Sequence, residues 1–383
     1  MLELLLGGLS AIGPLSIDMY LPAFPSIGRA LGSSQAEVQL TLASYFAGLA
    51  IGQLIVGPTL DRLGRKRPLL LGLTLYVVAS LACAFAPTIE VLIGARFVQA
   101  LGGAAALVGA RAIVRDVSSG IEAARMLSRL ILVMGLAPIV APLLGGWVLE
   151  VASFRAIFGL LAVAGVLAWV AIARLLPETR PPSREPAPFL PQVRALLTDW
   201  NFLRLSLAGG FGQAGMFAYI AGSPFVIIEL YGVPADAYGW IFGFNAAGLI
   251  ALSQYNRRAV QRWSVLPVLR TSTAIAAAAG VVLAVVGATG VFGLVGLLVV
   301  LWVFIGVLGL LMPNAIALAL EDQPSRAGAA SAVMGALQFG IAASAAALVS
   351  ALHDGSARPM TMVIAGFACA GFVVLRVGRR RGE

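Results

Sequence analysis

The chain has 383 residues, of which 60% are apolar and 11% are charged, and its mean hydropathy is +0.95. A soluble domain is about half apolar and about a quarter charged, so this composition excludes a water-borne globule and is typical of a membrane-embedded protein. It also excludes a disordered chain, a secreted disulfide scaffold and a nucleic-acid-binding protein. The formal charge of +9 therefore needs an explanation other than binding to nucleic acid.

Apolar stretches long enough to cross a bilayer as helices, about 17–25 residues each, recur along the chain. Twelve are predicted, near 4–27, 39–59, 68–87, 91–112, 126–149, 155–176, 203–228, 236–254, 265–287, 290–312, 327–351 and 359–376. The first stretch has an acidic flank at Glu3 and no small-residue cleavage site, so we expect a retained helix rather than a signal peptide. The sequence thus predicts an all-α polytopic membrane protein with twelve transmembrane helices.

Most of the 26 basic residues lie in alternate joints between the predicted spans. They form groups such as Arg62, Arg65, Lys66 and Arg67 after the second span, and Arg376, Arg379, Arg380 and Arg381 at the C-terminal end. The positive-inside rule assigns these joints to the cytoplasm, and an even number of spans places both termini there. The excess positive charge is therefore interpreted as an orientation signal in a multi-pass protein of a bacterial inner membrane.

The longest polar interruption runs from Pro177 to Asp199 and is rich in proline and charge. Such a segment cannot cross a bilayer, so we predict a cytoplasmic linker at 177–200 between two six-helix bundles, 1–176 and 201–383. A weak internal echo at an offset of 195 aligns Asp61-Arg62 with Asn256-Arg257. Parallel six-helix repeats with a site between them favour a transporter, although a structural pseudodimer would also have two halves.

Two charged residues stand out because they lie inside predicted spans, where a charge is costly unless it is paired or faces water. Asp18 lies in the first span, and desolvation would favour its protonated form, which suits a proton-coupling site. Arg96 lies in the fourth span at a similar depth, so direct or water-bridged pairing with Asp18 is expected. The alternatives are a permanently paired Asp18 and an Arg96 that snorkels to the headgroups.

The short joint from Gly57 to Pro68 contains one carboxylate and four cations. Gly64 permits the positive φ of a tight turn between helices. Asp61 and Arg65 can pair with groups at neighbouring helix ends, with Asp116 as the expected partner for a base. Such a cluster would act as a conformational latch, although a solvated loop that only sets topology is an open alternative.

Several motifs resemble those of the major facilitator superfamily. The run Gly57-x3-Asp61-Arg62-x-Gly64-Arg65-Lys66-Arg67 resembles its signature loop, and Arg96-x2-Gln99-x2-Gly102 resembles its fourth-helix motif. The run 137–146, with Pro138, Pro142, Gly145 and Gly146, resembles the fifth-helix antiporter motif, with Ala141 in place of its first glycine. These prolines and glycines also predict a bendable, closely packed helix, and ordinary small-residue packing is the alternative.

A narrower resemblance is carried by Asp18-Met19-Tyr20-Leu21-Pro22-Ala23, Gly222-Ser223-Pro224-Phe225 and Tyr231-Gly232-Val233. These runs resemble the bicyclomycin-resistance and chloramphenicol-efflux (Bcr/CflA) branch of drug–proton antiporters. The resemblance implies the twelve-helix major facilitator fold, export of drugs against proton entry, and Asp18 as the coupling carboxylate.

A pocket for a lipophilic drug should be mostly apolar and aromatic, with a few hydrogen-bonding groups. The substrate-binding candidates are Tyr20, Tyr45, Phe46, Gln213, Phe217, Tyr219, Phe225, Asn245 and Gln338. Any single aromatic among them could instead face lipid, whereas an amide in hydrocarbon needs a wet cavity or a neighbouring helix. His353 is expected to be a solvated loop residue.

These features predict proton-coupled multidrug efflux by a protein that is not an enzyme and has neither a metal site nor a cofactor, with protons as the coupling ion. The expected partners are a small-molecule drug, protons and the lipid bilayer, with no nucleic acid and a monomeric state. The nearest alternative is a proton-coupled exporter of a metabolite such as a sugar or an amino acid. A membrane enzyme would need several titratable or metal-binding groups at one depth, and a channel would need a selectivity filter.

Overall fold

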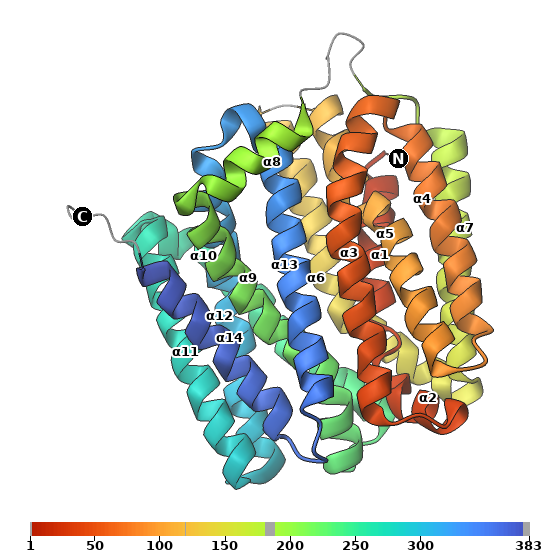
Figure 1. Ribbon diagram of the computed structural model, residues 1–383, viewed down its shortest axis with the longest axis vertical. Coiled ribbons are helices and arrows are strands. Elements are labelled where there is room, and N and C mark those ends of the chain that lie inside the picture. Colours follow the sequence, from red (N-terminus) through yellow and green to blue (C-terminus); the bar gives the residue numbers. More distant parts are fainter. Residues whose placement is uncertain (1, 119, 181–187, 378–383) are drawn as a thin grey trace. The chain divides into compact units, whose positions relative to one another are not determined.

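The computed structural model of the chain describes residues 2–118, 120–180 and 188–377 (Figure 1). Residues 181–187 of the predicted linker and the basic residues Arg379, Arg380 and Arg381 lie outside the described residues. Some side chains between 120 and 131, just before and at the start of the fifth predicted span, are likewise outside the description.

The described residues form helices without strands, which confirms the all-α prediction. The first half of the chain contains α1 (Leu2–Asp18), η1 (Leu21–Ala23), α2 (Phe24–Leu31), α3 (Gln35–Leu63), α4 (Lys66–Ala84), α5 (Ile89–Val117), α6 (Gly120–Val151), α7 (Phe154–Leu175) and α8 (Phe189–Thr198). The second half contains α9 (Trp200–Ser223), η2 (Pro224–Leu230), α10 (Ala235–Trp263), α11 (Val265–Thr289), α12 (Gly293–Glu321), η3 (Pro324–Arg326), α13 (Ala327–Ala351) and α14 (Arg358–Arg376).

Eleven segments of the described chain are long and apolar enough to cross a membrane, and together with α10 they account for the twelve predicted spans. The helix α10 has 29 residues, the same length as α3, but it is not among these eleven. Its second half carries amides and arginines from Gln254 to Arg262, which lower its hydropathy. The predicted span 236–254 corresponds to the more apolar first part of this helix.

The first predicted span, 4–27, is broken near its middle. Helix α1 ends at Asp18, and the chain continues through the 3₁₀ turn η1 into the short helix α2. Pro22 and Pro25 lie at the starts of these two elements. Proline has no N–H to donate, so it is favoured in the first turn of a helix, where that N–H has no partner within the helix. The break places Asp18 at a helix end.

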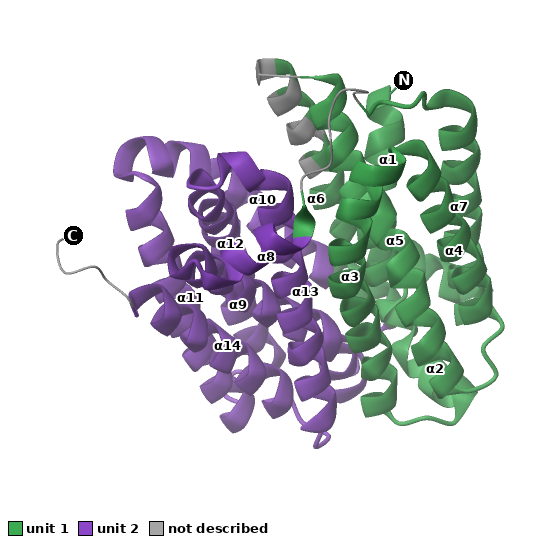
Figure 2. Cartoon of the chain, turned by 45° about the horizontal axis from the view of Figure 1, so that its top comes forward, with its two compact units in different colours: residues 1–189, 235–240 green, residues 190–234, 241–383 purple. Residues whose placement is uncertain are grey.

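The chain divides into two compact units, residues 1–189 with 235–240, and residues 190–234 with 241–383 (Figure 2). The first change of unit falls after Phe189, inside the predicted linker 177–200, whose later part forms α8. In unit 1, α5 packs against α3 and α4, while α7 packs beside α4 and α6 beside α1. In unit 2, α9 packs against α12, α13 and α14, and α11 packs against α12 and α14.

Small residues allow the helices of each unit to approach closely. A side chain at Gly48 or Gly52 of α3 would overlap α5, so these glycines allow the two helices to pack closely. In unit 2, Gly248 of α10 faces Trp302 of α12 in the same way.

The two units repeat one local pattern at a register that differs from the predicted one. Helices α3 and α10 both have 29 residues and both end at a residue of positive φ, Gly64 at 87° and Ser264 at 66°. Together with Gly48 and Gly248, these ends give an offset of 200 residues, so the predicted offset of 195 was wrong. The error arose because the charged residues of the two turns do not correspond.

Candidate functional site

Asp18 is the last residue of α1 and is 3% exposed. Within the described part of the chain, no hydrogen bond or ion pair reaches its carboxylate. The alternative considered above, a permanent ion pair of Asp18, is therefore not formed in this structure. A buried carboxylate without a partner is costly when it is ionised, so this position favours the protonated form.

Arg96 of α5 is completely buried, which excludes the snorkelling alternative. Its Nη1 donates to Gln99 Oε1 at 2.6 Å, and its Nη2 donates to the carbonyl of Ser16 at 2.9 Å. Its guanidinium carbon lies 4.3 Å and 4.1 Å from the ring centroids of Tyr20 and Tyr45. Aromatic faces at these distances stabilise a desolvated cation.

Pairing between Asp18 and Arg96 was expected to be direct or water-bridged; the direct ion pair is not formed in this structure, and the water-bridged pair stays a prediction. The guanidinium binds α1 through the backbone of Ser16, two residues before Asp18. Arg96 binds this carbonyl because the carbonyls in the last turn of a helix have no partner within the helix and accept a buried donor readily.

The polar groups around Arg96 form a chain that joins α1, α4 and α5. Gln99 Nε2 donates to Ser80 Oγ at 2.8 Å, and Ser80 Oγ donates to the Tyr76 carbonyl at 2.7 Å. The Tyr76 hydroxyl lies 2.7 Å from Ser16 Oγ, which itself donates to the Ile12 carbonyl. Tyr76 is therefore the donor to Ser16. Sequence reasoning missed Ser16, Tyr76 and Ser80, whose signal was the presence of hydroxyl groups in otherwise apolar spans.

Arg65 connects three helix ends in the turn between α3 and α4. Its Nη1 donates to Asp61 Oδ1 at 2.7 Å, and its Nε donates to Asp116 Oδ2 at 2.6 Å. A further bond of 3.3 Å from Nη2 makes the contact with Asp116 bidentate. Burial alone would lower the pKa of Arg65, but the hydrogen bonds to Asp116 and Asp61 outweigh it and raise the pKa further. Arg65 thus remains charged and is not a solvated loop residue.

The carboxylates of this latch differ in exposure. The side chain of Asp61 is 55% exposed, whereas that of Asp116 is 3% exposed, so Asp116 is the buried partner. Arg62 is exposed, and its carbonyl accepts a bond from Arg180. Gly57 lies one turn before Asp61 on α3. Gly64 has a φ of 87°, a conformation that favours glycine.

Pro138, Pro142, Gly145 and Gly146 all lie in α6, which continues through both prolines to Val151. A side chain at Gly145 would overlap the backbone carbonyl of Met19, the residue after Asp18. Gly146 faces Ala235 and Asp236, which belong to the same unit. The small residues therefore bring α6 against the end of α1.

The substrate candidates of unit 1 are enclosed in its core. Tyr20, Tyr45 and Phe46 are completely buried, and the first two surround Arg96. The Tyr20 hydroxyl lies 2.9 Å from Thr41 Oγ1. Tyr20 and Tyr45 form an aromatic cage around a cation in this structure, and the role of all three candidates in binding a substrate stays a prediction.

The candidates of unit 2 include two amide oxygens without partners. Asn245 donates to the Tyr219 hydroxyl at 3.0 Å, and the Tyr219 ring stacks on Phe242 at 5.4 Å. The carbonyl oxygens of Asn245 and Gln213 are buried and accept no hydrogen bond within the described residues. Such oxygens can accept a bond from a ligand or a water molecule.

Aromatic contacts involve the other candidates of unit 2. The ring centroids of Phe217 and Phe339 lie 5.9 Å apart. Gln338, which precedes Phe339 in the chain, is 9% exposed. Phe225 meets His353 edge-on at 4.5 Å. His353 lies in the loop after α13, as expected, and it is partly buried against this ring rather than fully solvated. The contact joins the loop after α13 to the π-helical turn η2.

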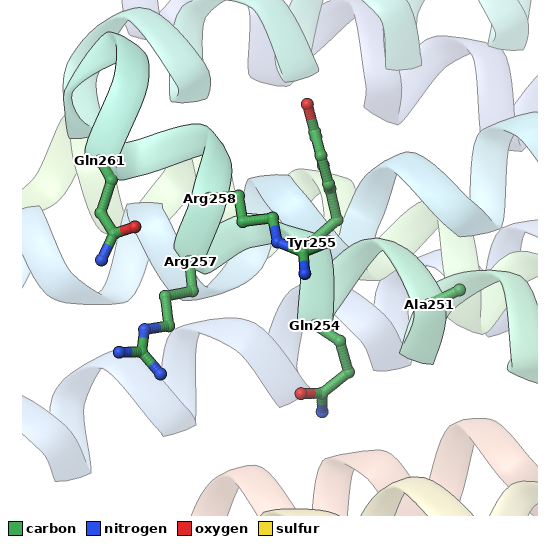
Figure 3. A pocket seen from close by; sticks show the side chains of 6 residues that line it. All are labelled: Ala251, Gln254, Tyr255, Arg257, Arg258 and Gln261. Atoms are coloured by element: carbon green, nitrogen blue, oxygen red, sulfur yellow. The ribbon is translucent and has the colours of Figure 1, made fainter.

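A hollow of about 510 Å³ lies along the second half of α10 (Figure 3). Its lining residues are Ala251, Gln254, Tyr255, Arg257, Arg258 and Gln261. Sequence reasoning treated Arg257 and Arg258 as topology signals, and it did not identify this polar surface. Among the described residues, no group of His, Cys, Asp and Glu side chains is arranged to hold a metal ion.

The Major Facilitator Superfamily model matches residues 6–347 of the chain. A crystal structure of a mutant of the nucleoside transporter NupG has a TM-score of 0.75 to this structure and covers 98% of this chain, with 13% identity. Its own chain is covered to 99%, so the likeness extends over the whole fold.

Three relatives are similar along most of the chain. A Bacillus subtilis protein described as "Uncharacterized MFS-type transporter YdgK" is 37% identical, covering 99% of this chain and 96% of its own. The "Bicyclomycin resistance protein homolog" of Haemophilus influenzae is 33% identical, covering 97% and 94%. A "Chloramphenicol resistance protein" of Pseudomonas aeruginosa is 32% identical, covering 81% and 71%.

The chain belongs to the major facilitator superfamily and is a multi-pass membrane protein of a transporter family rather than of an enzyme family. The resemblance to the Bcr/CflA branch is confirmed by the relatives.

Proposed function

We propose that the chain exports small lipophilic drugs across the bacterial inner membrane in exchange for protons, with both termini in the cytoplasm. The relatives described as bicyclomycin and chloramphenicol resistance proteins support this class of substrate. The observation that carries the proton coupling is Asp18, a buried carboxylate without a partner among the described residues, at the end of a transmembrane helix.

Asp18 acts on the rest of unit 1 through charge. Two residues before it, the Ser16 carbonyl accepts a bond from Arg96. When Asp18 is ionised, its negative charge strengthens the hold of the guanidinium on the end of α1, and protonation weakens that hold. Proton binding thereby changes the attachment of α1 to α4 and α5, and the transport cycle alternates between the two arrangements.

Binding of the drug is assigned to the aromatic and amide groups of the candidate set. In unit 2, the unpartnered oxygens of Asn245 and Gln213 supply acceptors beside the rings of Tyr219 and Phe217. Apolar surface with a few unpaired hydrogen-bonding groups suits a lipophilic molecule that carries hydroxyl or amide donors. Chloramphenicol is therefore the first probe to use.

The test measures proton release from energised inverted membrane vesicles after chloramphenicol is added. The wild type should release protons and concentrate the drug, and Asp18→Asn should do neither. Glu150→Gln removes an exposed carboxylate of α6 and is the matched control, which should behave as the wild type. Concentrative transport by Asp18→Asn would show that Asp18 is not the coupling site. Proton release driven by a sugar or an amino acid, but by no drug, would assign the chain to metabolite export.

A further inference from the structure

Glu178 follows α7 and is exposed, yet its carboxylate is surrounded by backbone donors from two parts of the chain. It accepts the N–H of Arg65 at 2.7 Å and that of Lys66 at 3.2 Å. It also accepts the N–H groups of Thr179 and Arg180 at 3.1 Å and 3.0 Å. A carboxylate with four backbone donors is a strong, charge-assisted contact.

The contact replaces a missing helix cap. Helix α4 begins at Lys66, and its own N-cap residue, Arg65, provides no side-chain cap. The first N–H groups of a helix need an acceptor, and a negative charge at this end is stabilised by the helix dipole. Glu178 supplies both from a position 113 residues further along the chain. A Cβ atom at position 64 would overlap this carboxylate, so Gly64 makes room for it.

Two more bonds join the same segments. Lys66 Nζ donates to the Ala173 carbonyl in the last turn of α7 at 2.8 Å. Arg180 Nη1 donates to the Arg62 carbonyl at 2.8 Å. Ala173, Glu178 and Arg180 thus attach this segment to the turn between α3 and α4 at three points.

Arg65 is consequently held through both its side chain and its backbone. Its side chain binds Asp61 and Asp116, while its backbone N–H binds Glu178. Arg65 is the donor in all three contacts. A displacement of the turn that breaks one of them therefore also moves the donor of the other two.

We propose that Glu178 is a positioning residue for the transport cycle: its carboxylate ties the segment 177–180 to the α3–α4 turn, so that this contact and the ion pairs of Arg65 form and break together. This inference rests on the proposed function only in that the transport cycle includes the breaking of the Arg65 cluster. The physical coupling itself exists whether or not a drug is the substrate.

The test is hydrogen–deuterium exchange on the purified full-length protein, which reads the four donor amides directly. Glu178→Gln should speed exchange of the amides of Arg65, Lys66, Thr179 and Arg180 by about tenfold, since each loses a bond to a charged acceptor. Glu178→Asp keeps the charge on a shorter side chain, and it should restore part of the protection. Glu321→Gln removes an exposed carboxylate from the end of α12 and is the matched control, which should change nothing at these amides.

The decisive variant is Asp116→Asn, because the described contacts connect Asp116 to the segment 177–180 through Arg65. Coupling requires that this variant also speeds exchange at Thr179 and Arg180, and that its effect is smaller when Glu178→Gln is already present. If Asp116→Asn leaves those two amides unchanged, Glu178 is a local cap and the proposal is overturned.

Transport gives a separate reading. Glu178→Gln should lower kcat for chloramphenicol export with KM nearly unchanged, because the residue acts on the conformational step. Unchanged kcat in a variant with faster exchange would overturn the role in the cycle. A wild type that exports no drug would contradict the proposed function, while the exchange data would still report on the latch.

Discussion

The two units differ in what they bury. Among the described residues, the buried charged residues are Asp18, Arg65 and Arg96, and these three, like the buried carboxylate of Asp116, belong to unit 1. The buried polar side chains of unit 2 are neutral, as in Gln213 and Asn245. A buried charge costs far more than a buried amide, and it responds to protonation whereas an amide does not. In the described part of the chain, buried charges are thus confined to unit 1, whereas unit 2 buries neutral hydrogen-bonding groups.

A similar contrast holds for the buried contacts that join neighbouring helices, since the ion pair of Arg326 with Asp199 in unit 2 is 28% and 27% exposed. In unit 1, Arg65 joins α3 and α5 through ion pairs with Asp61 and Asp116. In unit 2, α10 and α12 are joined by Asn314, whose amide donates to Asn256 Oδ1 at 2.7 Å. An ion pair can be broken by a change of charge, whereas the amide pair has the same strength at every pH in the working range.

The largest expected effect comes from Arg96→Ala in unit 1. The change leaves the Ser16 carbonyl and Gln99 without their donor and empties the aromatic cage, so we expect about 3–5 kcal/mol of destabilisation. The matched change in unit 2, Asn245→Ala, should cost about 1–2 kcal/mol. Thermal unfolding of the purified proteins measures both, and equal losses would remove the distinction between the units.

The ion pairs of Arg65 should contribute unequally. Asp116→Asn leaves a buried guanidinium without its bidentate partner, at a cost of about 3 kcal/mol. Asp61→Asn affects an exposed carboxylate, and the expected loss is below about 1 kcal/mol. Unfolding curves of the two variants test this order, and an effect of Asp61→Asn as large as that of Asp116→Asn would contradict it.

The amide pair of unit 2 should be the weaker link between helices. Asn314→Ala removes its bonds to Asn256 and to the Leu310 carbonyl, and about 1 kcal/mol of stability should be lost. The loss should be the same at pH 6 and pH 8 because neither partner titrates. A loss that varies with pH would mean that the amide pair is coupled to a titrating group.

The two turn residues of positive φ should respond in opposite directions. Ser264→Gly should stabilise the protein by about 0.5–1 kcal/mol, since glycine relieves the left-handed backbone conformation of Ser264. Gly64→Ser should destabilise it, because the new side chain adds strain and displaces Glu178. Paired unfolding measurements check the sign, and a stabilising Gly64→Ser would exclude the described position of Glu178.

The smallest expected effect is that of moderate acid on the α3–α4 turn. Partial burial alone would raise the pKa of Glu178, but hydrogen bonds from the backbone of Arg65, Arg180, Lys66 and Thr179 outweigh it and lower the pKa. The stabilisation is therefore complete above the ordinary pKa of a glutamate and is lost only as the pH falls through the lowered value. Exchange protection of the Lys66 amide, corrected for the intrinsic rate, should be constant from pH 8 to about pH 5. A loss of protection between pH 7 and pH 6 would identify a different titrating group.

The sequence was sufficient for the spans and for the partners of the signature loop. Hydropathy and length located the helices. The pairing of Asp116 with Arg65 was predicted because both lie at the same ends of neighbouring spans. These predictions succeed because they depend on local composition and on antiparallel neighbours joined by short turns.

The partner of Arg96 and the role of Glu178 could not be predicted in the same way. Arg96 binds the Ser16 carbonyl, and every residue has a carbonyl, so its use depends on where α1 stops. Glu178 lies in a segment that composition marks only as polar linker, and its donors are backbone groups without a sequence signal. The repeat register was misjudged because charge pattern was used, whereas helix length and glycine position are what the two units share.

The π-helical turn Pro224–Leu230 extends α9 at the point where the matching segment of unit 1 is broken into η1 and α2. A π turn contains about one residue more than an α turn, so it stores a single inserted residue within the helix. Deleting one residue there would restore a regular helix and rotate everything beyond it by about 100°. Phe225 would then no longer face His353. Deletion of a single codon would thus turn the side chains at the end of this span to other directions and leave its length nearly the same.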